Sequence, residues 1–352
     1  MTLYIGVDFH PHQQTVAWCD TQTGETNTCT LPHNLSEVLK FYQSVSPSIV
    51  GIEASSRAVW FEQLLSETNH QLLVGNPTLI RARARSRHKS DVRDAQLILD
   101  LLVKNEFPAI WRRPQTSNQV IDVLHLRRQL VHQRTQTYNR LQALAHSAGL
   151  PKGKMKTLSF QSSLKAVPMN ESGRMQREHL FSLLEQLTKQ IRELQSWLNR
   201  KASTDKQVQL LLTQRGVGYL TALAMVHTLG DVSRFEKVSK QVIAFAGLDS
   251  LEKSSAGKTR FGRISKAGSP LLRGLLGQSA NIVIRYDTRL KAFYKGLAKR
   301  KPIAVAKTAT ARKLLVKLAI MLRDNITADE FDRRGVTVGN ARFWTRSEMT
   351  VG

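Results

Sequence analysis

Short apolar runs bounded by turn-forming residues fill the first third of the chain. Residues 3–9, 14–19 and 25–31 show patterns typical of short strands, and the segments HPHQQ and DTQTGE between them have the composition of tight reversals. These strands therefore predict an antiparallel meander. Helical and strand-like patterns then alternate, and we place them at about 35–45, 48–53, 57–69, 71–77 and 78–104.

The order of these elements limits the fold. Three antiparallel strands followed by alternating helices and strands is the order of the ribonuclease H-like fold, in which a mixed sheet has helices on both faces. We therefore predict an α/β domain of this class over residues 1–110.

The middle of the chain has long helical patterns. Residues 116–148 carry an interrupted apolar stripe. A cleaner stripe repeats in steps of four and three along a second helix, at Leu180, Leu184, Leu187, Ile191, Leu194 and Leu198. Residues 151–174 lack sustained periodicity and predict a loop. Residues 111–204 are thus predicted to be a helical connector, either an internal antiparallel hairpin or a dimerising coiled coil.

The last third predicts a mainly helical domain over residues 205–325. Residues 216–218 form a Gly-Val-Gly turn between two apolar helices, which either exposes backbone N–H groups to a phosphate or is a plain helix turn. A polar loop rich in Ser, Gly, Lys and Arg follows a helix that ends at Gly247. The tail is assigned to residues 326–352, and the sequence from about residue 330 is predicted to be poorly ordered.

Charge is distributed unevenly along this pattern. The net charge is +25, from 52 Lys and Arg against 27 Asp and Glu, yet residues 1–110 hold only 9 of those cations and 11 of the acids. Residues 111–352 therefore carry 43 basic and 16 acidic side chains. A field of this sign concentrates phosphate backbones. We predict a polyanionic partner that binds mainly beyond residue 110.

Cysteine and hydropathy patterns indicate the compartment. Cys19 and Cys29 are too few for a zinc set or a disulfide framework, and they indicate free thiols in a reducing environment. No apolar stretch approaches the roughly 18 residues of a membrane span, and the first residues lack a charged and then apolar signal segment. We expect a soluble, cytoplasmic and nucleoid-associated protein with no membrane partner.

Four acidic residues are candidates for chemistry. Asp8 closes the apolar run LYIGVD and Glu53 closes the similar run SIVGIE, so both are expected at the ends of neighbouring central strands. Asp91 and Asp94 are three apart and share one face of a helix. Alone, this helical pair is explained as well by ion pairs with the Arg-rich stretch at 81–93. An unpaired carboxylate at a sheet centre is costly, however, and Mg²⁺ or Mn²⁺ would offset the repulsion and support phosphoryl transfer.

The polar loop before residue 269 supplies candidate nucleic-acid contacts. Its small residues permit close approach of a phosphate backbone. Four of its side chains could act as counter-charges: Lys258, Arg260, Arg263 and Lys266. On composition alone, Ser255 in this loop is better explained as a flexible turn residue.

Two sets of blocks resemble a known family. LYIGVD, GIEAS and KSDVRDA match the three blocks of the RuvC-like DEDD transposases, and AFAGL, SSAGK and ISKAGSPLLRGLL match their C-terminal transposase domain. The family includes the Piv/MooV-type invertases and the insertion-sequence group numbered one-ten, with its eleven-eleven subgroup. The resemblance covers residues 3–110 and 205–285. Ser90 stands where the family usually has Thr, and Ala256 stands where it has Gly.

This resemblance implies an enzyme, a site-specific DNA recombinase that excises and inserts its own mobile element. The metal ligands that it implies, for Mg²⁺ or Mn²⁺, are Asp8, Glu53, Asp91 and Asp94. It implies Ser255 as the nucleophile that forms a covalent phosphoserine with DNA, after activation by a base or a metal, and Ser254 is the neighbouring alternative. A noncoding bridge RNA that pairs with the element ends and the target DNA is also implied. We further expect a homo-oligomer, either a dimer or a tetramer.

Two rival functions remain open at this point. A metal-dependent junction endonuclease would use the same four acids with water as its nucleophile, so it would form no covalent protein–DNA adduct. A non-catalytic nucleic-acid-binding protein would use the acids as a structural ion-pair cluster, so its binding would not need metal and no strand would be cut.

Overall fold

The computed structural model describes the backbone of residues 3–55, 57–84, 90–255, 258–334, 337–338 and 341–342. Within these ranges the side chains of residues 252–261, 337–338 and 341–342 are not described. The chain divides into two compact units, Met1–Gln115 and Thr116–Gly352, and each unit is described by itself.

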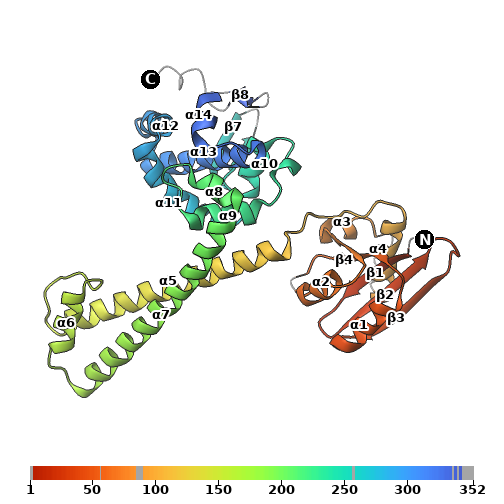
Figure 1. Cartoon of the computed structure of the whole chain (residues 1–352), viewed down its shortest axis with the longest axis horizontal. Helices are drawn as coiled ribbons and strands as arrows, with labels where there is room; N and C mark the ends of the chain where they lie inside the picture. The colour runs from red at the N-terminus through yellow and green to blue at the C-terminus, as the bar shows by residue number, and fades with distance from the viewer. Residues whose placement is uncertain are drawn as a thin grey trace. The chain divides into compact units, whose positions relative to one another are not determined.

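The first unit is built on a five-stranded mixed sheet with the order β3-β2-β1-β4-β5 (Figure 1). The strands are β1 (Leu3–Phe9), β2 (Gln13–Asp20), β3 (Thr26–Pro32), β4 (Ser48–Glu53) and β5 (Gln71–Gly75). The first three form the predicted antiparallel meander, and β1, β4 and β5 pair in parallel. The predicted mixed α/β character of this unit is thus confirmed.

Four helices flank this sheet. They are α1 (Leu35–Ser44), α2 (Val59–Ser66), α3 (Pro77–Arg81) and α4 (Asp91–Val103). On one face, Ile5, Val7 and Ile52 pack with Val38 of α1 and Phe61 of α2. Because side chains alternate along a strand, the residues between them face the opposite side, where α4 lies.

Helix α4 lies unusually close to the sheet because glycines face it. A Cβ added at Gly6 would lie 2.4 Å from the Ala95 carbonyl oxygen, and one added at Gly51 would lie 2.8 Å from the Leu102 side chain. Bulkier residues at these two positions would push the helix away. Glycine at positions 6 and 51 thus allows α4 to pack directly against β1 and β4.

The prediction of helical sequence throughout 78–104 is wrong. Helix α3 ends at Arg81, residues 82–84 and 90 are not helical, and α4 begins at Asp91; residues 85–89 lie outside the described residues. The new start has a local cause, because Ser90 is extended and its side chain accepts a hydrogen bond from the Arg93 backbone N–H.

The second unit is mainly helical. It contains α5 (Gln115–Ser147), α6 (Leu158–Ala166), α7 (Glu171–Thr204), α8 (Lys206–Leu212), α9 (Tyr219–Leu229), a 3-10 turn (Val232–Arg234), α10 (Val238–Phe245), α11 (Pro270–Tyr286), α12 (Thr288–Ala298), α13 (Ile303–Asp324) and α14 (Ala328–Arg334). Its strands are β6 (Ser250–Ser255), β7 (Lys258–Ile264), β8 (Thr337–Val338) and β9 (Ala341–Arg342).

Helices α5 and α7 form an antiparallel pair, and their apolar side chains pack against each other within one chain. Leu124 of α5 shares a core cluster with Leu198 of α7, and Leu141 of α5 shares a second cluster with Leu184 of α7. Four of the six predicted stripe residues are buried: Leu184, Leu187, Ile191 and Leu198. Of the two alternatives for this region, these contacts within one chain correspond to the internal hairpin.

The predicted loop at 151–174 is wrong, because this segment contains α6 and the first turn of α7 (Figure 1). Met155 and Leu164 are buried against Leu141 and Leu184, so packing on the long helices stabilises a segment that has no apolar periodicity of its own.

The core of the second unit is centred on α13. Leu314, Leu315 and Leu318 of this helix are fully buried. The prediction of poor order from about residue 330 is wrong for residues 330–334, because α14 packs its fully buried Phe331 into the same core. Most of the remaining tail lies outside the described residues.

Candidate metal centre

Asp8 and Glu53 lie where the sequence pattern placed them. Strands β1 and β4 are neighbours and parallel, with Val7 opposite Ile52. Each acid is the next residue along its strand, so the two leave the sheet at the same edge. Because Asp8 follows Gly6 by two residues and Glu53 follows Gly51 by two, both belong to the face that α4 covers.

Helix α4 brings the other two acids to this edge. Asp91 and Asp94 lie in its first turn, directly after the Ser90 cap. The exposed N–H groups of a helix start carry partial positive charge, which stabilises carboxylates there. The local sequence therefore explains why two like charges are tolerated three residues apart.

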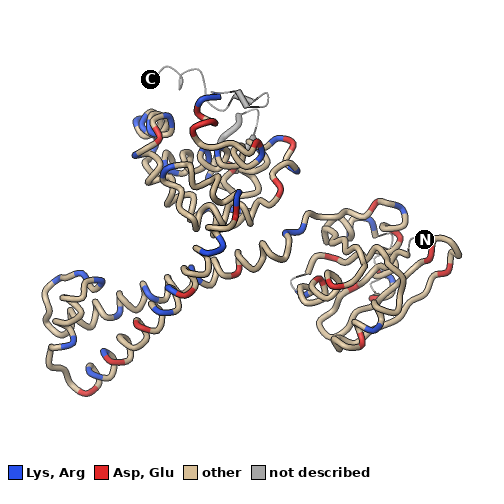
Figure 2. Tube along the Cα trace, in the orientation of Figure 1, with Lys and Arg blue, Asp and Glu red and all other residues tan. Residues whose placement is uncertain are grey.

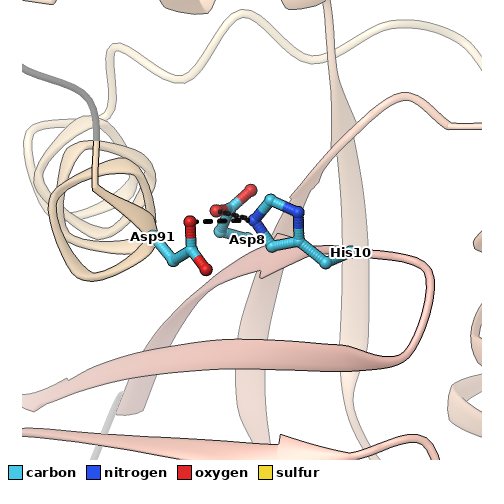
Figure 3. Close-up of side chains that lie close together, drawn as sticks. All are labelled: Asp8, His10 and Asp91. Atoms are coloured by element: carbon cyan, nitrogen blue, oxygen red, sulfur yellow. Dashed lines mark hydrogen bonds and ion pairs between the residues drawn. The ribbon is translucent and has the colours of Figure 1, made fainter.

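Asp8, Asp91 and a histidine meet at the centre of the site. The His10 Nε2 atom lies 2.8 Å from Asp8 Oδ2 and 3.2 Å from Asp91 Oδ1, as Figure 3 shows. One possible ligand atom from each of these three residues lies within 4.8 Å of the others. An ionised carboxylate only accepts hydrogen bonds, so Nε2 carries the proton that it donates to Asp8.

The electrostatic environment acts most strongly on Asp8. Burial raises the pKa of the Asp8 carboxyl above its ordinary value, and contact with His10 partly opposes this effect. The negative charges of Asp94 and Asp91 raise this pKa further. Asp94 therefore lies near enough to act on Asp8, although it is not in the three-residue group.

Glu53 has a different partner. Its Oε1 accepts from Arg81 Nη2 at 3.2 Å, and Arg81 is largely exposed. The structure thus brings Asp8 and Asp91 together, places Asp94 within electrostatic reach, and pairs Glu53 with an arginine.

His10 was missed by sequence reasoning, which treated HPHQQ only as a turn. The signal was its position two residues after Asp8, because alternate residues of an extended segment project to the same side.

The donor set suits a divalent cation. Carboxylate oxygens are the ligands that hard cations prefer, and imidazole nitrogen is a common additional ligand. A buried carboxyl group with a raised pKa and like-charged neighbours is stabilised by such an ion. Asp8 and Asp91 therefore form the centre of a candidate metal site, with Asp94 beside it and His10 bound between the two carboxylates in the metal-free protein.

The second unit carries the predicted serine and basic residues. Ser255 ends β6 and pairs with Lys258 of β7, so the predicted polar loop is largely a β-hairpin rather than an irregular segment. Ala256 and Gly257 lie outside the described residues, as do the side chains of Ser254, Ser255, Lys258 and Arg260. Arg263 and Lys266 are exposed.

Two arginines brace the base of this hairpin. Arg312 of α13 donates to the Leu248 carbonyl oxygen at 2.5 Å and to Ser250 Oγ at 3.1 Å. Arg273 of α11 donates to the carbonyl oxygens of Ala246 and Gly268, at 3.0 and 2.7 Å. The segment that leads to Ser255 is thus anchored by buried or half-buried contacts at its start.

Two family models match this chain. One, of DEDD transposases of the IS110 group, matches residues 5–148, and the other, described as the transposase IS116/IS110/IS902 family, matches residues 208–295. The chain belongs to the IS110 family of DEDD transposases. The two matched segments contain the four candidate acids of the first unit and the hairpin of the second.

Curated relatives of this transposase span most of its length. A probable family 20 transposase of Pseudomonas aeruginosa is 26% identical over 293 residues, which cover 79% of this chain and 85% of the relative. The transposase for insertion sequence element IS1328 of Yersinia enterocolitica is 28% identical, with 79% and 84% covered. The transposase for insertion sequence element IS1111A of Coxiella burnetii is 29% identical, with 64% of each covered.

As a DEDD transposase the protein is an enzyme with DNA as a partner, which agrees with its charge. In the backbone trace of Figure 2, positions occupied by Lys or Arg recur along α5, α7 and α12 of the second unit. Among the described helices, none has both the length and the hydropathy to cross a membrane.

Proposed function

We propose that this transposase excises and inserts its own mobile element by cutting and rejoining DNA at a Mg²⁺- or Mn²⁺-dependent acidic site. The observation that carries the proposal is the convergence of Asp8 and Asp91 at one sheet edge, within reach of the charge of Asp94. The proposal includes a RuvC-like fold for the first unit, which the sheet order and the flanking helices support.

The roles of the acids follow from their positions. Asp8, Asp91 and Asp94 would hold the metal, and Glu53 would join them once Arg81 releases it. A bound divalent ion supplies Lewis-acid activation of the attacking oxygen and stabilises the leaving oxygen. His10 keeps the two nearest carboxylates paired until the metal binds.

Ser255 is proposed as the nucleophile. Its hydroxyl oxygen would form a phosphoester with the DNA backbone as one phosphodiester bond breaks, and a DNA hydroxyl would leave. Lys258, Arg260, Arg263 and Lys266 would bind the phosphates on either side. Arg312 anchors the start of β6, the strand that ends at Ser255, and this anchor supports the proposal because a nucleophile must be held in place.

The proposal also assigns a nucleic-acid partner and a role to each part of the second unit. A noncoding bridge RNA would pair with the element ends and the target, and the basic second unit would hold it. Residues 111–204 would act as the connector and 205–325 as the serine-bearing domain. The transposase would work in the cytoplasm, at the nucleoid, as a homo-oligomer of two or four chains.

Adduct formation tests this mechanism. The full chain is incubated with Mg²⁺, the RNA transcribed from the element and a plasmid that carries the element, and denaturing gels report covalent protein–DNA adducts. Ser255→Ala is expected to abolish the adduct and recombination, with Ser254→Ala as the tolerated control. Asp8→Asn and Asp94→Asn are expected to abolish strand exchange while nucleic-acid binding persists.

Specific results would contradict each part. Recombination that survives in the Ser254→Ala, Ser255→Ala double mutant would rule out serine chemistry, and cleavage without any adduct would favour the junction endonuclease. Strand exchange that survives in Asp8→Asn or Asp94→Asn would remove the metal-site assignment.

A further inference from the structure

A polar cavity of about 320 Å³ lies in the second unit, away from the serine hairpin in sequence. Its walls come from the turn after α8, the junction of α11 with α12, and the first residues of α14, and they include Gln214, Arg215, Tyr286, Asp287 and Arg289. The volume is at the lower end of the range for ligand sites, so it suits one small planar group.

The turn that forms one wall is fixed in place by Gly216. This residue has a φ of 92°, and a Cβ there would lie 2.9 Å from the backbone nitrogen of Val283. A side chain at this position would clash with α11. The close approach therefore holds Gln214 and Arg215 against the end of that helix.

Two cavity residues keep polar atoms without partners. Gln214 is only 4% exposed, and its Nε2 donates to Arg215 O and Asp287 Oδ2, each at 3.4 Å. Among the described residues, Gln214 Oε1 and Arg289 Nη1 are buried and have no hydrogen-bond partner. Leaving such atoms unpaired is costly. Both atoms are closed to solvent in this structure, so a ligand in the cavity would bond them after the Gln214 amide or the Arg289 guanidinium rotates.

Charge within the cavity is nearly balanced, unlike the rest of the unit. Lys317 is fully buried beneath it, with Nζ 3.1 Å from Asp287 Oδ2 and 2.9 Å from Asp332 Oδ1. Arg215 and Arg289 are cations in the wall, and Asp329 adds a third acid. Balanced charge gives a phosphate little advantage here, and it favours a neutral polar ligand.

The side chains of Arg215 and Tyr286 stack on each other in the wall of the cavity. The guanidinium carbon of Arg215 lies 4.8 Å from the Tyr286 ring centroid, and Tyr286 is 51% exposed. Aromatic rings and arginine planes are the groups on which proteins stack unpaired bases. We propose that this cavity takes a single unpaired nucleobase from a strand held by the surrounding basic surface.

The proposal explains the features together. The face of the base would extend the Tyr286–Arg215 stack, and its edge would hydrogen-bond the polar wall formed by Gln214, Asp287 and Arg289. The base-binding proposal requires only that the protein binds nucleic acid, so it is independent of the metal and of Ser255. The base could belong to DNA or to RNA, because both carry the same hydrogen-bonding edges.

The test uses full-length Asp8→Asn protein and measures binding rather than strand cleavage, so its outcome is read separately from that of the metal assignment. Affinity is measured for hairpins of DNA and of RNA that carry one unpaired 2-aminopurine, and for fully paired hairpins of equal length. Anisotropy gives the dissociation constant, and the 2-aminopurine lifetime reports stacking of the base.

Tyr286→Ala is expected to weaken binding of the unpaired-base hairpins at least about fivefold, in the DNA series, the RNA series or both, and to leave the paired hairpins unchanged. Tyr286→Phe should restore both affinity and lifetime. Arg215→Gln, at an exposed position, should reproduce the selective loss if Tyr286→Ala folds poorly. Lys295→Ala, an exposed cation on α12 outside the cavity, should weaken both kinds of hairpin alike.

Two results would overturn the proposal. If Tyr286→Ala and Arg215→Gln leave the selectivity for an unpaired base unchanged in both DNA and RNA, or reduce paired and unpaired binding equally, no base occupies this cavity. A 2-aminopurine lifetime that is the same in wild type and Tyr286→Ala would likewise show that the base does not stack there.

Discussion

The His10 imidazole bridges two carboxylates, with Nε2 2.8 Å from Asp8 Oδ2 and 3.2 Å from Asp91 Oδ1 (Figure 3). The imidazole lies between the two carboxylates, where a bound cation would most reduce their mutual repulsion. The His10 contact therefore stabilises the metal-free protein, and a metal held by the same carboxylate oxygens would have to displace it.

Replacing His10 should separate these two effects. His10→Ala is expected to lower the free energy of unfolding of the metal-free protein by about 1 kcal/mol, because a charge-assisted hydrogen bond at a partly exposed site is lost. The gain in melting temperature on addition of Mg²⁺ should then be larger than in wild type. His12→Ala, exposed and outside the site, is the control. A smaller gain in His10→Ala would show that His10 is itself a ligand.

Asp8 gives a prediction about pH. Because burial and the neighbouring acids raise the pKa of Asp8 in the folded protein, the folded state holds this proton more tightly than the unfolded state does. The stability of the metal-free protein should therefore fall as pH rises from the ordinary value of 3.8 through the raised one.

Asp8→Asn removes that dependence. In chelator at pH 7 it should melt at a higher temperature than wild type, and the difference should vanish below pH 3.8, where Asp8 is protonated in both states. Divalent metal should stabilise wild type and not Asp8→Asn. A metal-free variant that melts below wild type at pH 7 would contradict the cost assigned to this carboxylate.

The sheet and the places of the acids could be predicted because their signals are local. Alternating residues closed by a carboxylate are visible in LYIGVD and SIVGIE, and Asp91 and Asp94 share a face in any helix. Helix α6 could not be predicted in the same way. Its Leu158 is 81% exposed while Leu164 is fully buried, so contacts with α5 and α7, rather than its own periodicity, stabilise it.

The contacts that the site residues make with other helices and strands could not be predicted from the sequence. Arg81 is 28 positions from Glu53, and their pairing depends on how α3 follows β5. The side of the sheet edge on which His10 lies could be read from its place two residues after Asp8, but its contact with Asp91 depends on where α4 begins. Such contacts between elements decide which acids are free to bind metal, and no spacing rule encodes them.

The Arg81–Glu53 pair leads to a third prediction. Arg81 is 73% exposed on its side chain, so Arg81→Ala should change the free energy of unfolding by less than about 1 kcal/mol. It should also free Glu53 and tighten Mn²⁺ binding, measured by calorimetry. Arg83→Ala, at another exposed position after the same helix, is the control and should leave the affinity unchanged. Unchanged Mn²⁺ affinity in Arg81→Ala would mean that Glu53 does not join the metal site.

Lys317 gives the last prediction, on the stability of the second unit. Its ammonium group is fully buried between Asp287 and Asp332, and it ties α13 to the start of α12 and to α14. Lys317→Met should lower the free energy of unfolding by about 3–5 kcal/mol in urea, because the buried Asp287 carboxylate loses its partner. Adding Asp287→Asn and Asp332→Asn should recover much of that loss, since no buried charge then remains unpaired.

Lys307→Met, on the exposed side of the same helix, is the control and should change stability by less than about 0.5 kcal/mol. A triple variant no more stable than Lys317→Met would show that the lysine acts through packing rather than through its charge.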